Sequence, residues 1–253
     1  MALGNAQSGT AAGGEGSGSQ REYYELRRYQ LRSGPQGKLV EKFMAETFIP
    51  GLNKLGLKPI GAFTLTLGPQ TPALYLLIPS ASLDLLASAE SRLAQDDDYM
   101  RAGAAFLAAP AKEPAYERLE SSLMIAFEGW PKLVVPPVTA QNGKRIFQLR
   151  TYESPSFKAH RTKVKMFHSG EFDIFRKAGF WQVFFGDTLV GPRLPNLTYM
   201  LSYPDLGELN GKWDAFFSSP EWKKLAASPE FNYEATVSNV TNLILTPTSY
   251  SQI

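Results

Sequence analysis

The sequence predicts an α+β protein in which two tandem ferredoxin-like (βαββαβ) domains cover each other's open sheet face within one chain. Three observations lead to this prediction. The chain repeats itself at a shift of 123 residues. Each half reads as strand, helix, two strands, helix and strand. Both helices of such a half cover one face of its sheet, so the other face needs a partner surface, which a duplicated chain carries itself.

The internal repeat rests on identities that chance does not produce. Eleven positions between 26 and 74 are identical at the shift of 123, where roughly three matches are expected at ordinary composition. Several of them are Gly and Pro, which report backbone geometry rather than general hydrophobicity. The pairs are Leu26 with Leu149, Arg27 with Arg150, Tyr29 with Tyr152, Ser33 with Ser156, Lys42 with Lys165, Lys54 with Lys177, Gly56 with Gly179, Gly68 with Gly191, Pro69 with Pro192, Pro72 with Pro195, and Leu74 with Leu197.

Each copy shows the same succession of local patterns. Apolar residues at helical spacing, such as Leu39, Phe43 and Leu52, predict the first helix, and alternating apolar residues predict the strands. Gly56 is placed to end that helix, because glycine readily adopts the left-handed backbone of a helix C-terminus. The predicted strands are 22–31, 57–67, 73–79, 119–127, 145–153, 180–190, 197–203 and 236–246, and the predicted helices are 36–55, 81–108, 156–178 and 205–227.

The chain divides into a leader, two domains and a linker. Residues 1–21 are rich in Gly, Ala and Ser, which predicts a flexible leader. The domains are expected at 22–130 and 145–253, with a Pro- and Gly-containing linker at 131–144. The small residues at 2–6 have the character of a signal-peptide cleavage region, so we expect an exported or periplasmic protein whose signal is removed. A cytoplasmic protein with a leader of no targeting meaning is the alternative.

Composition narrows the classes of function. The chain has 253 residues, no cysteine and a formal net charge of +2. Zero cysteine excludes a disulfide scaffold, thiol catalysis and cysteine-ligated metal sites. Nucleic-acid-binding domains are usually strongly basic, and the small net charge does not indicate one. No segment of the sequence is long and apolar enough to span a membrane as a helix. No nucleotide-binding or serine-hydrolase motif is present, and we expect neither a metal nor a cofactor.

The first strand of each copy carries the candidate site. Side chains alternate across a strand. We expect one set, Tyr24 and Leu26 with Phe147 and Leu149, to pack under the helices. The other set is expected to point into the space between the two facing sheets and consists of Glu25, Arg27 and Tyr29 with Gln148, Arg150 and Tyr152.

Two interpretations of this polar set remain open. Burying an unpaired charge costs several kcal/mol even after relaxation, and Glu25 is the only carboxylate of the set. In the first interpretation, Arg27 and Arg150 are forked clamps for a small anionic or phenolic ligand that the tyrosines orient. In the second, the arginines pair with Glu25 and backbone carbonyls in a structural network that fills the interface.

Other residues give weaker signals. His160 and His168, the only two histidines, lie eight positions apart on a predicted helix and cannot jointly ligate one ion without distortion. Either one alone remains a candidate general base or haem ligand, or an ordinary solvated or core residue. Asp96, Asp97 and Asp98 are expected to start a short helix, where negative charge suits the exposed amides. A basic helical stripe is expected to be solvated, with an anionic partner as the alternative; its residues are Lys158, Arg161 and Lys165.

Several segments resemble the NIPSNAP family. They are Tyr24-Glu25-Leu26-Arg27-Arg28-Tyr29 and its echo Phe147-Gln148-Leu149-Arg150-Thr151-Tyr152, Gly56 with Ile60-Gly61-Ala62-Phe63, and the segment from Met166 through Glu171 to Phe180. The similarity extends over about 22–250. It implies a dimeric α/β barrel whose biochemical role is mostly uncharacterised. Relatives with that barrel include small cofactor-free monooxygenases, isomerases and haem-handling enzymes, but fold kinship does not establish a reaction.

Three functions follow as hypotheses. The first is binding of a small anionic or phenolic molecule in the barrel lumen. The second is a non-catalytic protein-interaction module with a packed barrel, and the third is a cofactor-free monooxygenase or isomerase-like enzyme. Under the first, a ligand stabilises the fold by mass action. Under the second, no carboxylate or phenol changes the melting temperature. Barrel closure within one chain leaves further association of barrels open.

Overall fold

A computed structural model describes residues 20–253 apart from 67 and 69. The predicted leader at 1–21 therefore lies almost wholly outside the described residues. Within the described part of the chain, no helix is long and apolar enough to cross a membrane.

The two halves of the chain have the same order of elements. The first repeat contains β1 (Tyr23–Gln30), α1 (Pro35–Phe43), η1 (Met44–Phe48), α2 (Ile49–Lys54), β2 (Gly61–Leu65), β3 (Ala73–Ser80), α3 (Leu83–Leu93), α4 (Asp97–Ala102), α5 (Ala104–Leu107) and β4 (Arg118–Ala126). After η2 (Pro137–Gln141), the second contains β5 (Ile146–Glu153), α6 (Phe157–Met166), η3 (Phe167–Glu171), α7 (Phe172–Lys177), β6 (Trp181–Val190), β7 (Asn196–Tyr203), α8 (Leu206–Ser218), α9 (Pro220–Ala226), η4 (Pro229–Phe231), α10 (Tyr233–Thr236) and β8 (Asn239–Pro247).

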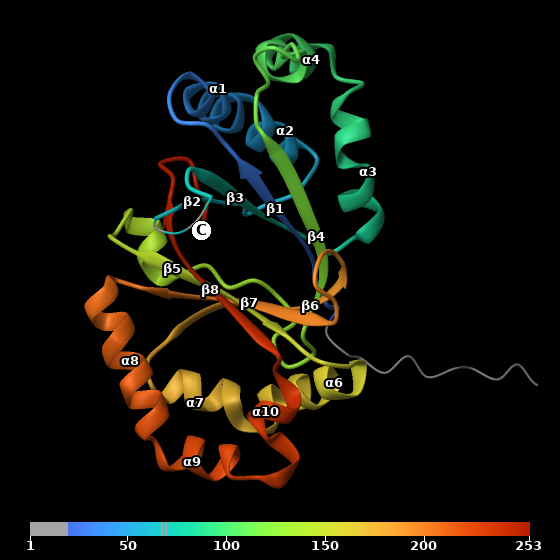
Figure 1. The fold of residues 1–253 in the computed structure, drawn as a ribbon. Coiled ribbons are helices and arrows are strands. Elements are labelled where there is room, and N and C mark those ends of the chain that lie inside the picture. The colour runs from blue at the N-terminus through green and yellow to red at the C-terminus, as the bar shows by residue number, and fades with distance from the viewer. Residues whose placement is uncertain (1–19, 67, 69) are drawn as a thin grey trace, which may run out of the picture.

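The eight strands form one closed barrel in the order β1-β3-β2-β8-β5-β7-β6-β4. Each repeat supplies four adjacent strands, and its helices pack outside them, at opposite ends of the molecule in Figure 1. Two antiparallel seams join the repeats. Leu65 pairs with Leu245 where β2 meets β8, and Met124 pairs with Thr188 where β4 meets β6. The predicted fold class, two ferredoxin-like repeats in an intrachain barrel, is confirmed.

The duplication extends to details of backbone geometry. Both long helical segments have an irregular turn at matched positions, a π-helical turn in η1 and a kink in η3, where Gly170 has a non-helical φ of 140°. Both end at a glycine with positive φ, 89° at Gly56 and 78° at Gly179, as expected for a glycine C-cap. Asp96 starts α4 as predicted, because its carboxylate accepts hydrogen bonds from the backbone N–H groups of Asp98 and Tyr99.

Two local predictions differ from the structure. The predicted strand at 236–246 begins later, because η4 and α10 occupy 229–236 and Asn232 caps the latter. The predicted strand at 57–67 pairs only over β2, since residues 57–60 lead into it without strand pairing. Short helical turns of three or four residues lack the length over which an amphipathic pattern can be recognised.

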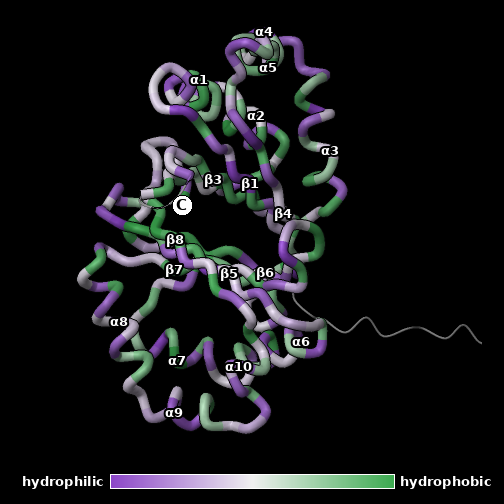
Figure 2. The backbone as a smooth tube through the Cα atoms, in the orientation of Figure 1, coloured by the Kyte–Doolittle hydropathy of each residue, from purple (hydrophilic) through white to green (hydrophobic). Residues whose placement is uncertain are grey.

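Three apolar cores hold the molecule together. One lies between the first sheet and its helices and a second lies in the corresponding place of the other repeat. The third fills most of the barrel lumen and contains Tyr24, Phe63, Leu77, Phe147, Leu149, Phe184 and Leu245 among others. Figure 2 shows hydrophobic residues along the barrel strands, with hydrophilic ones on outer segments such as α9.

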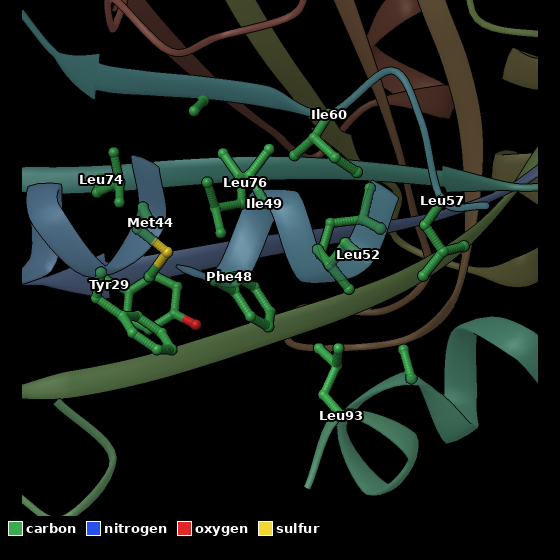
Figure 3. Packing of buried hydrophobic residues seen from close by; sticks show 14 of the residues in the cluster. Tyr29, Met44, Phe48, Ile49, Leu52, Leu57, Ile60, Leu74, Leu76 and Leu93 are labelled. Atoms are coloured by element: carbon green, nitrogen blue, oxygen red, sulfur yellow. The ribbon is translucent and has the colours of Figure 1, made fainter. Parts of the chain in front are cut away.

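The predicted orientation of β1 and β5 was wrong. Tyr24, Leu26, Phe147 and Leu149 face the lumen, whereas the polar set lies on the opposite face, towards the helices. Figure 3 shows Tyr29 beside Met44 and Phe48 in the helix-side core. The reason is that alternation separates two sets without saying which one faces inward when both faces are covered. An eight-stranded barrel has an interior that side chains can fill, and here apolar side chains fill it.

Candidate functional site

In the first repeat, the polar set on β1 forms a satisfied ion-pair network. The Arg27 guanidinium donates from Nε and Nη2 to the two oxygens of Glu25, at 2.7 and 2.8 Å. Its Nη1 donates to Glu90 of α3. Ser121 of β4 also donates to Glu25, at 2.7 Å. This arrangement corresponds to the structural interpretation of Arg27, since its donors are taken by carboxylates of the chain itself.

In the second repeat, no carboxylate among the described residues pairs with the matched arginine. Arg150 donates from Nη2 to the Tyr152 hydroxyl at 2.9 Å, and its guanidinium carbon lies 4.6 Å from the centre of the Trp213 ring. Gln148 stands where β1 has Glu25, and its Oε1 accepts hydrogen bonds from Trp213 and Tyr203. Aromatic faces and a phenol therefore take the place of carboxylates around this cation.

The second repeat also buries an ion pair that the sequence did not indicate. Lys163 of α6 donates to Glu171 of η3 at 2.9 Å, and each side chain is 3% exposed. The Tyr152 hydroxyl lies 2.9 Å from that of Tyr199. Burial raises the pKa of Tyr199 well above its ordinary value, so this phenol stays protonated at neutral pH. At a shift of 123 the first repeat has Val40 and Phe48 in place of the ion pair.

The barrel contains a cavity at the end of the lumen where β1 and β5 terminate. We call it the mouth cavity; its volume is about 440 Å³. Both repeats line it, so it lies between the two sheets. Its lining residues are Leu26, Arg28, Leu65, Gln70, Tyr75, Glu120, Ser122, Leu149, Thr151, Pro192, Arg193, Asn196, Thr198, Thr241 and Leu243.

Matched strand positions place different chemistry on the two walls of the mouth cavity. On the first wall, Arg28 of β1 is paired in register with Tyr75 of β3 and Glu120 of β4. On the second wall, the corresponding row has threonine at every position, Thr151 on β5 with Thr198 on β7 and Thr241 on β8. The walls thus differ strongly in charge although the backbone is duplicated.

Arg28 is the central cation of the first wall. Its Nη2 lies 2.8 Å from the Glu120 carboxylate, and Nη1 donates to Gln70. The side chain is 17% exposed, and its Nε is buried with no hydrogen-bond partner among the described residues. Burial raises the pKa of Tyr75, and the Arg28 charge opposes that rise without cancelling it. Tyr75 is therefore a protonated hydroxyl at neutral pH.

The remaining sequence candidates lie outside this cavity. His160 is buried on the helix side, where Nε2 lies 2.7 Å from Asp187 of β6. The His168 ring bridges backbone groups, with Nε2 accepting from the N–H of Gly129 and Nδ1 at 2.9 Å from the carbonyl of Val164. Among the described residues, no cluster of three or more His, Asp or Glu side chains could hold a metal ion.

Sequence reasoning turned the wrong face of β1 and β5 towards the lumen. Arg28 and Thr151 are neighbours of the predicted Arg27 and Arg150, one position further along each strand. The signal that could have found them is the difference between copies. Arg28 becomes Thr151 and Tyr75 becomes Thr198, whereas Arg27 and Tyr29 are identical to their counterparts.

The barrel order, the two inter-repeat seams and the lumen define the class of protein as a dimeric α/β barrel closed within one chain. The family description NIPSNAP matches residues 24–128 and 147–252, one repeat each, and the chain belongs to the NIPSNAP family. This confirms the resemblance seen in the β1 and β5 segments. No curated protein matches the sequence.

Solved structures with the same fold include two proposed monooxygenases. One from Fusobacterium nucleatum has 9% identity and a TM-score of 0.58, with 90% of this chain and 93% of that one covered. One from Lactobacillus acidophilus has 8% identity and a TM-score of 0.55, with 90% and 94% covered. An uncharacterised NIPSNAP-like domain protein from Burkholderia xenovorans is 22% identical over 42% of this chain and 88% of its own, with a TM-score of 0.38. Identities this low show a shared fold alone.

Proposed function

We propose that this NIPSNAP protein binds a small molecule with an anionic or phenolic group in the mouth cavity. The observation that carries the proposal is the half-buried Arg28 guanidinium on one wall of a 440 Å³ cavity inside the barrel. Ligand sites are typically concave, largely apolar and supplied with a few convergent polar groups. The mouth cavity has this combination.

The polar groups of the cavity favour a ligand that accepts hydrogen bonds. Arg28 has a buried Nε without a partner, and Tyr75 is a protonated phenol beside it. Arg193 is a second cation of the lining; its Nη1 donates to Thr241 and lies 3.4 Å from a Glu153 carboxylate oxygen. The lining residues carry two arginines, of which Arg28 pairs with Glu120 and Arg193 with Glu153. A carboxylate or a phenol oxygen is the group that such donors stabilise best.

The apolar groups define the other end of the ligand. Leucines from both repeats form the inner part of the cavity, where it borders the packed lumen, and they are Leu26, Leu65, Leu149 and Leu243. A ring or short alkyl group fits against them, and its burial adds about 25 cal/mol per Å² of apolar surface. The proposed ligand is therefore amphipathic, with its polar end at Arg28. The proposal concerns binding and includes no reaction.

The experiment replaces Arg28 with the residue found at the matched position of the second repeat. Arg28→Thr converts the first wall to the residue that the second repeat has at Thr151, so the backbone position is known to accept it. The probes are benzoate, phenol and benzyl alcohol, measured by calorimetry and by the change in melting temperature. We expect benzoate or phenol to bind and benzyl alcohol to bind more weakly. Loss of a charge-assisted hydrogen bond should weaken benzoate or phenol about 10- to 100-fold.

The matched control is Arg101→Thr, which removes a positive charge from α4, where Arg101 pairs only with the exposed Asp98. It should leave binding unchanged. Equal weakening by both substitutions would show a general charge effect and contradict the proposal. Absence of a melting-temperature change with all three probes would instead favour the non-catalytic interaction module.

A further inference from the structure

A second hollow lies on the outer side of the first sheet, away from the mouth cavity. It runs between α3 and the strands β1 and β4 and has a volume of about 360 Å³; we call it the α3 groove. Its walls are mainly aliphatic and its floor is polar. The lining residues are Glu25, Arg27, Leu83, Leu86, Ala87, Glu90, Leu119, Ser121 and Leu123.

The charges of the α3 groove do not balance. Arg27 lies between two carboxylates, Glu25 and Glu90, so the network has a net charge of −1. Glu25 is satisfied by the bidentate Arg27 pair and by Ser121. Glu90 uses Oε1 for Arg27, and its side chain is 63% exposed. The groove therefore presents an accessible carboxylate above leucine side chains, and a cation is the complementary charge.

The second repeat shows that this hollow is not a requirement of the fold. At the positions matched to Glu25 and Glu90 it has Gln148 and Trp213. The Trp213 ring stacks on the Arg150 guanidinium and donates its N–H to Gln148, and this side chain is buried. One tryptophan thus replaces the carboxylate and occupies the corresponding place beneath α8. The acidic, open version belongs to the first repeat.

We propose that the α3 groove is a binding site for a small organic monocation with an apolar chain, such as a primary alkylammonium. The ammonium group would sit at Glu90 and offset the excess charge of the Glu25–Arg27–Glu90 network. The chain would cover Leu83, which is 39% exposed, together with the neighbouring leucines of the groove. An anion of the same size is repelled, and a neutral alcohol leaves the excess charge unchanged.

The experiment compares three probes of equal length, n-hexylammonium, n-hexanol and hexanoate, by NMR titration of the methyl signals at neutral pH. We expect saturable binding of n-hexylammonium at one site, at least tenfold weaker binding of n-hexanol, and none of hexanoate. Glu90→Gln should weaken n-hexylammonium binding about tenfold or more, the size expected for a charge-assisted contact. Equal binding of n-hexylammonium and n-hexanol would overturn the proposal.

A second variant fills the α3 groove with a tryptophan, as Trp213 does at the corresponding place in the second repeat. Glu90→Trp introduces the residue of the matched position, so we expect a folded protein with a cooperative unfolding transition and no n-hexylammonium binding. Glu221→Gln removes an exposed carboxylate from α9 and is the control that should bind normally. Retained binding in Glu90→Trp, or lost binding in Glu221→Gln, would contradict the assignment. Arg28→Thr should leave this site intact, which separates it from the mouth cavity.

Discussion

The two repeats have the same backbone fold, but the matched arginines Arg27 and Arg150 have different partners. Arg27 is paired with two carboxylates, one on its own strand and one on α3. Arg150 lies against Trp213 and Tyr152 and donates to a phenol. The comparison teaches that a buried guanidinium can be accommodated either by charge pairing or by aromatic faces. Which solution is used depends on neighbouring helices rather than on the strand that carries the arginine.

The buried ion pair of the second repeat should show the largest effect. Lys163→Val or Glu171→Phe alone leaves a charge unpaired in the core, and each should lower the free energy of unfolding by about 3–5 kcal/mol. The double variant, which carries the residues found at Val40 and Phe48, should lie within about 2 kcal/mol of the parent. Urea unfolding measures all three. Additive losses in the double variant would show that the cost is steric.

The two arginines themselves provide a medium-sized test. Arg27→Met leaves Glu25, which is 15% exposed, without its bidentate partner, and should cost about 3 kcal/mol of unfolding free energy. Arg150→Met leaves no carboxylate without a partner. It should lower the free energy of unfolding by about 1 kcal/mol, because one hydrogen bond and one cation–π contact are lost. Denaturant unfolding of both variants gives the difference. Equal losses would mean that charge pairing is not what distinguishes the repeats.

The smallest effect concerns alkaline pH. Burial raises the pKa of Tyr199 above 10, so the native state keeps a proton that the unfolded chain loses. Its contribution to stability is complete below about pH 10 and is lost as the pH rises towards the native pKa, at about 1.4 kcal/mol per pH unit. Tyr199→Leu, the residue of the first repeat at Leu76, should reduce the slope of unfolding free energy against pH by that amount. An unchanged slope above pH 10 would refute this role.

Much of the fold could be predicted because its signals are local and duplicated. The Gly56 and Gly179 helix ends, the Asp96 cap and the alternation of β1 and β5 are all readable from neighbouring residues. Their recurrence in both copies made the repeat visible. The pairing of the two sheets then followed from the need of each sheet for a partner surface, and the resemblance to the NIPSNAP family implied the closed barrel.

The site could not be predicted in the same way, because it depends on which sheet face is turned inward. On β1, both Arg27 and Arg28 are charged, and both faces of the strand are covered in the barrel. Glu90, whose carboxylate accepts a hydrogen bond from Arg27, lies 63 residues away on α3. The pattern of residues around Arg27 in the sequence does not indicate a partner so far along the chain.

Covalent connection of the two repeats has a consequence for how the cavity could arise. In an assembly of identical chains, rotational symmetry copies every substitution to both walls, so an arginine at position 28 would face an arginine across the axis. Here Arg28 faces a wall that carries Thr151, and the carboxylate of Glu120 has no counterpart opposite. Two repeats in one chain are free of that constraint. This chain can therefore form a cavity with one charged wall and one uncharged wall, which orients an asymmetric ligand. A strictly symmetric homodimer cannot form such a cavity.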